Sequence, residues 1–402
     1  MTSGNLSACV ASLRAQLLAL DLDTTDQDLL ASLREVSDLV NSAHSVQTRM
    51  ICALDASQRV ADDANEVPVE RRRGVTARVA GALRESPHNA QIMIGVARAL
   101  VHEMPCTFRA LAAGVLTPYR ARVLVAETAC LSLADRQAAD IRVCGDLASL
   151  DGVGTRKIGG LARKVGYELD PVSFVRRNAK AVNDRFVSLR PAPDCMTYLT
   201  ALLPMAQGVA CLAALRSAAA TAVGTGDGRG TGQVMADTLV ERLTGQAVAD
   251  QVPIGLHLVM SDSSLFARGT TPARIVGHGP LPASLARQLV AAAPAVRSWV
   301  KRLYEAPNGL VATEARSRCF PDGLAELITV RDDTCRTPWC DAPIRHIDHI
   351  TAWADGGPTS LANGQGLCEQ CNHDRQDPAW TRAGPQLSPV AEAASRGQPD
   401  AA

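Results

Sequence analysis

Two histidines and an aspartate stand within four positions near the carboxyl end of the chain, in the sequence IRHIDHI at residues 344–350. The whole chain of 402 residues has only eight histidines. An imidazole titrates near neutral pH and can accept a proton, and a neighbouring carboxylate can bind a divalent cation. Asp348 and His349 therefore form a candidate reaction site, if the surrounding chain holds them in place.

Two pairs of cysteines flank this stretch, whereas the other eight of the twelve cysteines stand singly. Four residues separate Cys335 from Cys340, two separate Cys368 from Cys371, and 27 lie between the pairs. Four thiolates brought together are typical of a closed tetrahedral zinc site that holds a small fold together. An iron–sulfur cluster can also use four thiolates. We predict a structural Zn²⁺ ion at these four cysteines.

The residues between the cysteine pairs predict a hairpin, a loop and a short helix. IRHIDHITAW is typical of a strand, ADGGPTSLANGQG of a turn-rich loop that contains Asn363, and LCEQCNHDR of a helix start. Helical spacing would bring Cys371, Asn372 and Arg375 close together. A purely structural zinc clip needs only the cysteines, and an unused buried Asp–His pair would cost desolvation energy.

The order of these residues resembles the HNH endonuclease motif of the ββα-metal fold. That motif has Asp-His, then Asn, then Cys-x-x-Cys-His/Asn-x-x-Lys/Arg on a helix, and here its parts are Asp348-His349, Asn363 and residues 368–375. The resemblance covers residues 330–382. Many members have His directly after the second helix cysteine, whereas this chain has Asn372 and then His373.

The resemblance implies a metal-dependent endonuclease that hydrolyses DNA phosphodiester bonds. It implies His349 as the general base and Asn363 as a residue that orients His349 by a hydrogen bond. Asp348 with Asn372, or with His373 as the fallback, would hold a catalytic Mg²⁺ or Mn²⁺ ion. Further contacts to nucleic acid are expected from Arg336, Arg345, Arg375 and His346. The same pattern is compatible with RNA, and the alternative is a catalytically idle zinc-knuckle protein that binds nucleic acid or regulates.

Most of the remaining chain is similar to an actinobacterial group known as the thirteen-E-twelve repeat family. The segments that carry this similarity include ALRESPHNAQIMIGVARALVHEMPCTFRALAAGVLTPYRARVLVAET, ADTLVERLTG and GHGPLPASLARQL. The family joins a helical domain of unknown function to an HNH module. The similarity implies this architecture and leaves the role of the helical domain open.

The expected fold class is mainly α with a few strands, in which a helical N-terminal region precedes a small zinc-clipped ββα-metal module. We expect four parts: an amphipathic helix region at 1–70, a mainly helical domain at 71–320, the HNH module at 330–382 and a disordered tail at 383–402. Thr25 and Asp28 resemble a capping box at the start of a long helix. Strands are predicted at 186–190 and 252–261, and a helix at 284–304.

Two local patterns allow more than one interpretation. The short helices predicted around residues 86–126 are compatible with a helix-turn-helix, but a plain helical bundle is favoured because nothing marks a recognition helix. The glycine-rich stretch at residues 222–232 lacks the Lys-Ser/Thr ending of a phosphate-binding P-loop. We therefore predict a connecting loop there and give nucleotide binding little weight.

Charge is distributed unevenly along a chain whose formal net charge is zero. Residues 1–70 carry four basic and eleven acidic side chains, whereas residues 71–190 carry twenty basic and ten acidic ones. A basic segment is a candidate surface for a polyanion, and ordinary solvated helix faces are the alternative. Residues 331–382 hold five arginines and eight acidic residues. We therefore expect the helical part to supply affinity for DNA and the C-terminal module to supply cleavage.

The sequence also predicts where the protein works. No uninterrupted run of eighteen apolar residues occurs, and the first residues lack the basic start and apolar block of a secretory signal. We expect a cytoplasmic protein that has no membrane partner. The sequence does not indicate an oligomeric state.

Overall fold

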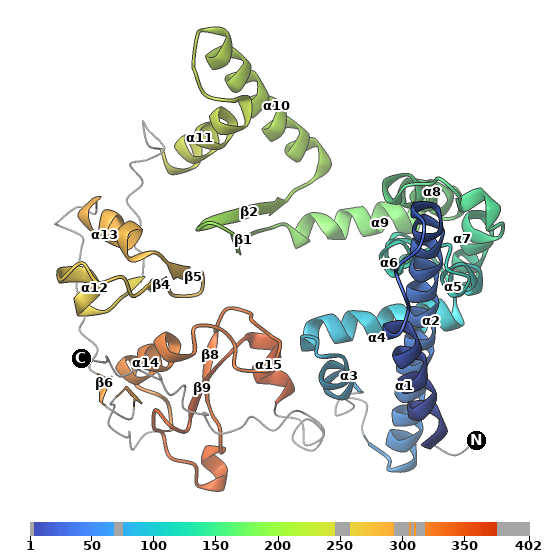
Figure 1. The fold of residues 1–402 in the computed structure, drawn as a ribbon, viewed down its shortest axis with the longest axis horizontal. Helices are drawn as coiled ribbons and strands as arrows, with labels where there is room; N and C mark the ends of the chain where they lie inside the picture. Colours follow the sequence, from blue (N-terminus) through green and yellow to red (C-terminus); the bar gives the residue numbers. More distant parts are fainter. Residues whose placement is uncertain are drawn as a thin grey trace. The chain divides into compact units, whose positions relative to one another are not determined.

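A computed structural model describes residues 4–67, 75–245, 258–292, 305–306, 309–310 and 318–375 (Figure 1). Helices dominate and strands are few, so the expected fold class is confirmed. By their contacts the residues form two compact units, one of residues 1–67 and 91–175 and the other of residues 68–90 and 176–402. The boundaries expected at residues 70 and 320 are not those of the two units and stay predictions. The tail at 383–402 lies outside the described residues.

The first unit contains α1 (Gly4–Leu18) and the long helix α2 (Asp26–Ala64). Helix α2 begins as predicted, because the Thr25 side chain accepts a hydrogen bond from the Asp28 backbone N–H at 3.2 Å. Farther along α2, the Asn41 side chain donates to the Gly114 carbonyl and the Ser42 hydroxyl donates to the Ala112 carbonyl, both at 2.8 Å. These carbonyls lie at the end of α5 (Pro105–Ala112), where a helix leaves acceptors unpaired.

Helices α4 (Pro87–His102), α5, α6 (Pro118–Glu127), α7 (Leu133–Cys144) and α8 (Thr155–Leu169) follow, and α5 to α8 share one hydrophobic core with the last turns of α4. Proline starts three of them, since it needs no N–H partner in the first turn. The buried Asp140 of α7 accepts from the backbone N–H groups of Cys106 and Thr107, at 2.6 and 2.9 Å, and so caps α5. This packing is the helical bundle that the sequence favoured.

Helix α3 (Thr76–Leu83) precedes α4 in the chain. After α8 come α9 (Pro171–Ala181), a hairpin and a pair of helices. Strands β1 (Phe186–Ala192) and β2 (Met196–Leu202) pair antiparallel, which confirms the strand predicted at 186–190 and adds a second that was not predicted. Helices α10 (Met205–Gly224) and α11 (Thr231–Thr244) pack on each other.

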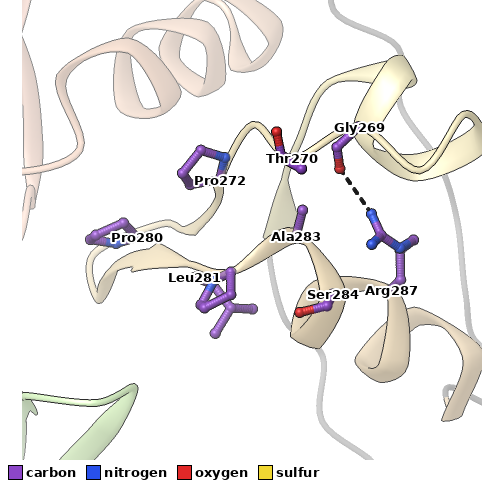
Figure 2. Close-up of a pocket in the computed structure, with 9 residues that line it drawn as sticks. Gly269, Thr270, Pro272, Pro280, Leu281, Ala283, Ser284 and Arg287 are labelled. Atoms are coloured by element: carbon purple, nitrogen blue, oxygen red, sulfur yellow. Dashed lines mark hydrogen bonds between the residues drawn. The ribbon is translucent and has the colours of Figure 1, made fainter.

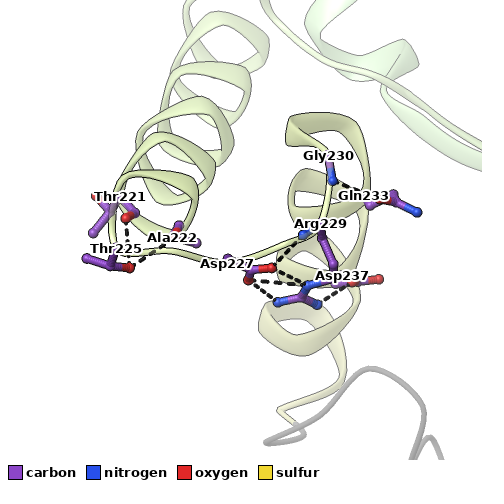
Figure 3. A network of polar contacts seen from close by, with 8 residues as sticks. All are labelled: Thr221, Ala222, Thr225, Asp227, Arg229, Gly230, Gln233 and Asp237. Atoms are coloured by element: carbon purple, nitrogen blue, oxygen red, sulfur yellow. Dashed lines mark hydrogen bonds and ion pairs between the residues drawn. The ribbon is translucent and has the colours of Figure 1, made fainter.

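The predicted loop at residues 222–232 is a charged turn between α10 and α11 (Figure 3). Arg229 pairs with Asp227 at 2.7 Å and with Asp237 at 2.6 Å. Hydrogen bonds from Arg229 lower the pKa of Asp227 to about 2. The guanidinium of this glycine-rich turn is therefore already neutralised by two carboxylates.

Helix α10 is long and apolar enough, by length and composition, to cross a membrane. Its sequence contains no uninterrupted apolar run of eighteen residues, because Arg216 and several polar residues interrupt it. Core helices of soluble proteins meet the same criterion, although only 6% of this apolar stretch is buried. A membrane role stays untested.

Residues 258–292 form a small sheet with two helices, which are β3 (Leu258–Val259), α12 (Asp262–Phe266), β4 (Ala273–Ile275), β5 (Gly279–Leu281) and α13 (Ala283–Ala292). The strand predicted at 252–261 and the helix predicted at 284–304 lie only partly in the described residues. A cavity of about 510 Å³ is lined here by Pro272, Leu281 and Arg287, among others (Figure 2). The Arg287 guanidinium donates to the Gly269 carbonyl at 3.1 Å. None of the predicted site residues lines this cavity.

After the short pair β6 (Glu305–Ala306) and β7 (Gly309–Leu310), the last described residues, 318–375, form a compact module. It consists of α14 (Asp322–Asp332), β8 (His346–His349), a 3-10 turn at Trp353–Asp355, β9 (Gly364–Leu367) and α15 (Glu369–Asp374). β8 and β9 pair antiparallel, so that His346 is opposite Leu367 and His349 is opposite Gly364. Hairpin, loop and helix follow one another as the sequence predicted.

Candidate metal site and active site

The four paired cysteines meet at one point of the C-terminal module. Their sulfur atoms all lie within 4.8 Å of one another, and the Cys340 sulfur is 3.6 Å from that of Cys368 and 3.5 Å from that of Cys371. Backbone hydrogen bonds hold the first pair in place, from Cys335 N to Ala342 O at 2.8 Å and from Cys340 N to Thr337 O at 3.0 Å. Three of the four cysteines are buried.

The chemistry of this cluster fits a zinc ion. Four thiolates at about 2.3 Å from a tetrahedral Zn²⁺ stand about 3.8 Å apart, close to the observed sulfur separations. Hydrogen bonds among the thiols lower the pKa of Cys335 and raise the pKa of Cys340 and of Cys371. Ionisation of one thiol thus makes ionisation of its neighbours less favourable, and only a bound cation would allow all four thiols to ionise.

His349 ends strand β8 and is nearly buried, with 7% of its surface exposed. Its Nε2 atom lies 2.9 Å from the hydroxyl of the buried Thr359, and its ring packs 4.5 Å from that of Phe320, centroid to centroid. Burial lowers the pKa of His349, against an opposing contribution from the Asp348 charge. Burial therefore favours the neutral imidazole, which is the form that a general base requires.

Asp348 precedes His349 on the strand and is more exposed. Its Oδ2 atom lies 3.2 Å from Nη1 of Arg375, the residue that follows α15, and Arg375 also donates to the Ile350 carbonyl. Asp348 is 40% exposed and the Arg375 side chain only 16%. The carboxylate is thus within reach of solvent ions while an arginine currently balances its charge.

Helix α15 presents further polar groups to β8, against which it packs. Asn372 is half-buried and precedes Arg375 by one helical turn. The rings of His373 and His346 are exposed, with centroids 6.4 Å apart. The fold thus gathers His346, His373 and the Asp348–Arg375 pair between strand and helix. Carboxylate and amide oxygens with imidazole nitrogen are a donor set that suits Mg²⁺ or Mn²⁺.

Asn363 does not have the role that the sequence predicted. Its side-chain oxygen accepts from the Thr351 N–H at 2.8 Å, and its amide donates to the carbonyls of Thr351 and Pro358 at 3.1 and 2.8 Å. The predicted hydrogen bond to His349 is therefore wrong, and Thr359 is the partner instead. Asn363 closes the loop, where a Cβ on Gly357 would collide with the Thr351 carbonyl oxygen at 1.9 Å.

Helix α14 belongs to the site, which the sequence analysis missed. Arg331 donates to the Gly364 carbonyl at 2.7 Å, and Asp332 accepts from the Gly366 N–H at the same distance. A Cβ on Gly364 would lie 2.3 Å from the Ile328 side chain, so glycine lets α14 pack directly on β9. No local sequence pattern indicates this link, because Arg331 and Asp332 bond to backbone groups of β9.

The two other arginines predicted to contact nucleic acid, Arg345 and Arg336, differ in their exposure to solvent. Arg345 is exposed and could reach a phosphate. Arg336 is only 20% exposed, its Nε lies 3.9 Å from Asp332, and its Nη1 is buried without a hydrogen-bond partner among the described residues. Burial lowers the pKa of Arg336. Arg336 therefore faces the interior of the module, where a phosphate contact is not expected.

Comparison with protein families places this geometry in context. The model described as "Domain of unknown function (DUF222)" matches residues 30–332. The chain belongs to the DUF222 family. A second model, "HNH endonuclease", matches residues 334–377, so the expected HNH module after a domain of unknown function is confirmed. No curated protein and no solved structure matches the chain. An HNH domain indicates an endonuclease family and a nucleic-acid substrate.

Proposed function

We propose that this DUF222 protein is a metal-dependent endonuclease that hydrolyses phosphodiester bonds of DNA through its HNH module. The observation that carries the proposal is the placement of His349. It is a buried imidazole held on one nitrogen by Thr359, beside a solvent-accessible carboxylate, within the segment that matches the HNH model.

In this proposal His349 takes the tautomer in which Nε2 carries the proton, so that the two ring nitrogens have different roles. With the proton on Nε2 and donated to Thr359, the lone pair of Nδ1 is available to a water molecule. His349 would then take a proton from that water, which attacks the phosphorus as the bond from phosphorus to the leaving oxygen breaks. Burial of His349 favours this neutral form by lowering its pKa.

The remaining residues would position the substrate and two ions. Asp348 with Asn372, or with His373, would hold a Mg²⁺ or Mn²⁺ ion, which stabilises the charge of the departing oxygen when bound. Arg375, Arg345 and His346 would contact the phosphates on either side. Zn²⁺ at the four cysteines would hold α15 against the hairpin.

The proposal is tested with purified protein, supercoiled plasmid and either Mg²⁺ or Mn²⁺, together with a zinc assay. We expect metal-dependent nicking or linearisation that His349→Ala abolishes while about one zinc remains per chain, as four thiolates require. His44→Ala, at an exposed histidine of α2, is the matched control and should cut like the wild type.

The alternative is a catalytically idle zinc-knuckle protein that binds nucleic acid. Intact plasmid with either ion, for supercoiled, linear and single-stranded DNA and with zinc fully bound, would favour it. Cutting that survives in His349→Ala would also contradict the proposal. An RNA substrate offered in parallel determines which nucleic acid is preferred.

A further inference from the structure

Helices α6 and α8 of the first unit form a continuous surface, because they run side by side in the same direction. Near their starts, Arg120 Nε donates to the Thr155 hydroxyl at 3.4 Å, and at the end of α6 Glu127 pairs with Arg163, in the middle of α8, at 2.5 Å. In between, Gly159 of α8 lets Val123 approach, since a Cβ there would lie 3.1 Å from the Val123 side chain.

The outer side of this helix pair is basic. Ile158, Ala162 and Val165 of α8 are buried in the core, so the opposite side of the helix faces solvent. Three exposed cations of α8 lie there, and Arg122 is an exposed cation of α6; none of the four makes an ion pair with any residue that the structure describes. We call them the basic face: Arg122, Arg156, Lys157 and Lys164.

The acidic side chains within these two helices do not cancel this charge. Glu127 and Glu168, the carboxylates of α6 and of α8, are already paired with Arg163 at 2.5 Å and with Arg142 at 2.5 Å. Two exposed aromatic rings accompany the cations, Tyr119 at 67% exposure and Tyr167 at 54%. Cations interleaved with exposed aromatic rings suit a nucleic-acid strand, whose phosphates need counter-charge and whose sugars and bases can stack.

The C-terminal module does not supply such a surface itself. Residues 331–382 carry five arginines and eight acidic residues, and two of those arginines, Arg331 and Arg375, are engaged with Asp332 and Asp348. A phosphodiester backbone would be repelled by this net charge unless another part of the chain attracted it.

We propose that the basic face of α6 and α8 is the docking surface that supplies most of the affinity of this protein for the DNA backbone. The inference rests on the proposed function for its substrate and adds the residues that bind it. Docking through phosphates predicts little sequence preference and a strong dependence on salt.

The test measures DNA binding by the full zinc-loaded chain, all forms carrying His349→Ala so that the DNA stays intact. The basic-face variant combines Arg156→Glu, Lys157→Glu and Lys164→Glu. The matched control combines Arg14→Glu, Arg34→Glu and Arg49→Glu, which makes the same charge change at exposed arginines of α1 and α2. Anisotropy of a labelled DNA duplex is recorded over a range of NaCl concentrations, and thermal unfolding checks that each variant is folded.

We expect the basic-face variant to bind at least about tenfold more weakly at low salt, with the slope of log K against log salt reduced by about 2 to 3. The control should stay within about twofold of its parent. Equal weakening by both variants, or an unchanged slope in the basic-face variant, would overturn the inference. So would tighter binding to phosphatidylserine vesicles than to DNA that depends on the same three residues.

Cleavage by the protein with His349 intact separates this inference from the proposed function. Binding that depends on the basic face without any cleavage would leave the docking surface standing and defeat the nuclease. Cleavage combined with DNA binding that does not change in the basic-face variant would contradict the docking surface and leave the proposed nuclease activity standing.

Discussion

Arg375 Nη1 lies 3.2 Å from Asp348 Oδ2, so the arginine that follows α15 neutralises the carboxylate expected to hold a divalent ion. The same guanidinium also donates to the Ile350 carbonyl, which ties the helix end to the strand that carries His349. Arg375 therefore has two opposite effects on metal binding by Asp348. It holds the strand and helix together, and it competes with a cation for Asp348.

Removal of this competitor is expected to strengthen metal binding. Because Asp348 is 40% exposed, the pair is worth up to about 1 kcal/mol, so Arg375→Gln should tighten Mn²⁺ binding by at most about fivefold. Isothermal titration calorimetry of zinc-loaded protein measures this without any cleavage assay. Arg345→Gln, at an exposed arginine of the same module, is the control. Weaker Mn²⁺ binding in Arg375→Gln would show that the arginine positions Asp348 instead of competing for its ligand.

Zinc removal should unfold the C-terminal module and leave the helical unit intact. The four sulfur atoms tie the segment of the first two cysteines to α15, and β8 and β9 form only a four-residue pair. A small sheet of this size depends on the metal for its stability. Cys371→Ser should lose about one zinc per chain and expose residues 318–375 to protease, whereas Cys9→Ser should not. Full zinc retention in Cys371→Ser would contradict a four-cysteine site.

The Thr359 hydroxyl is expected to fix the orientation and tautomer of His349, the proposed general base. Thr359→Val keeps the shape of a fully buried residue but removes the partner of His349 Nε2, which frees the ring to turn and to change tautomer. We expect kcat to fall by at least about tenfold with KM for DNA nearly unchanged. Ser360→Ala, at the neighbouring residue, controls for changes in the loop. Unchanged kcat in Thr359→Val would show that another group orients His349.

Sequence reasoning identified what depends on residue type and short spacing. The cysteine cluster, the neighbouring Asp348 and His349, and the start of α2 at Thr25 all follow from local patterns, and the structure shows each of them. The hydrogen-bond partner of His349 did not follow, because nine residues separate it from Thr359 and the geometry of this loop decides which hydroxyl lies next to the imidazole. Likewise, nothing local indicates that Arg336 turns inward.

The N-terminal boundary of the module, at α14, was also hard to predict, for a different reason. Helix α14 has an ordinary mixed sequence, and its link to the site consists of contacts to carbonyl and N–H groups of β9, which any sequence could provide. The boundary between the two matched families, at residues 332 and 334, passes through this group of contacts. A sequence pattern is a pattern of side chains, whereas β9 takes part in these bonds through the Gly364 carbonyl, which accepts, and the Gly366 N–H, which donates.

A fragment that begins after α14 is therefore expected not to fold. Residues 334–382 lack Ile328, Arg331 and Asp332, which would leave the buried Gly366 N–H unsatisfied and expose the packed surface at Gly364. Residues 318–382 retain all of these contacts. With zinc present, amide NMR spectra should be dispersed for the longer fragment and collapsed for the shorter one. Equal dispersion of the amide signals in both fragments would show that the module folds without α14.

Asp55 of α2 gives a prediction for the helical unit and its dependence on pH. Its side chain, 3% exposed, accepts from Arg98 Nε and Nη2 at 2.7 and 2.6 Å and from Arg59 at 2.5 Å. Burial alone would raise the pKa of Asp55, but the hydrogen bonds from Arg98 and Arg59 outweigh it and lower the pKa below 3.8. Asp55→Asn removes the charge that two arginines share. Since both arginines are about half exposed, we expect a loss of about 1–3 kcal/mol of unfolding free energy at pH 7.

The sign of the pH effect follows from the lowered pKa. The stabilisation by Asp55 is fully present above the unfolded-state value near 3.8 and is lost as pH falls through the lower folded-state value. The stability gap between wild type and Asp55→Asn should therefore stay constant from pH 7 to about 5 and close at still lower pH. Urea unfolding followed by circular dichroism measures this gap, and Glu35→Gln, at an exposed residue of the same helix, should show none. A gap that persists undiminished at about pH 2 would mean that Asp55 stabilises the helices by shape and not by charge.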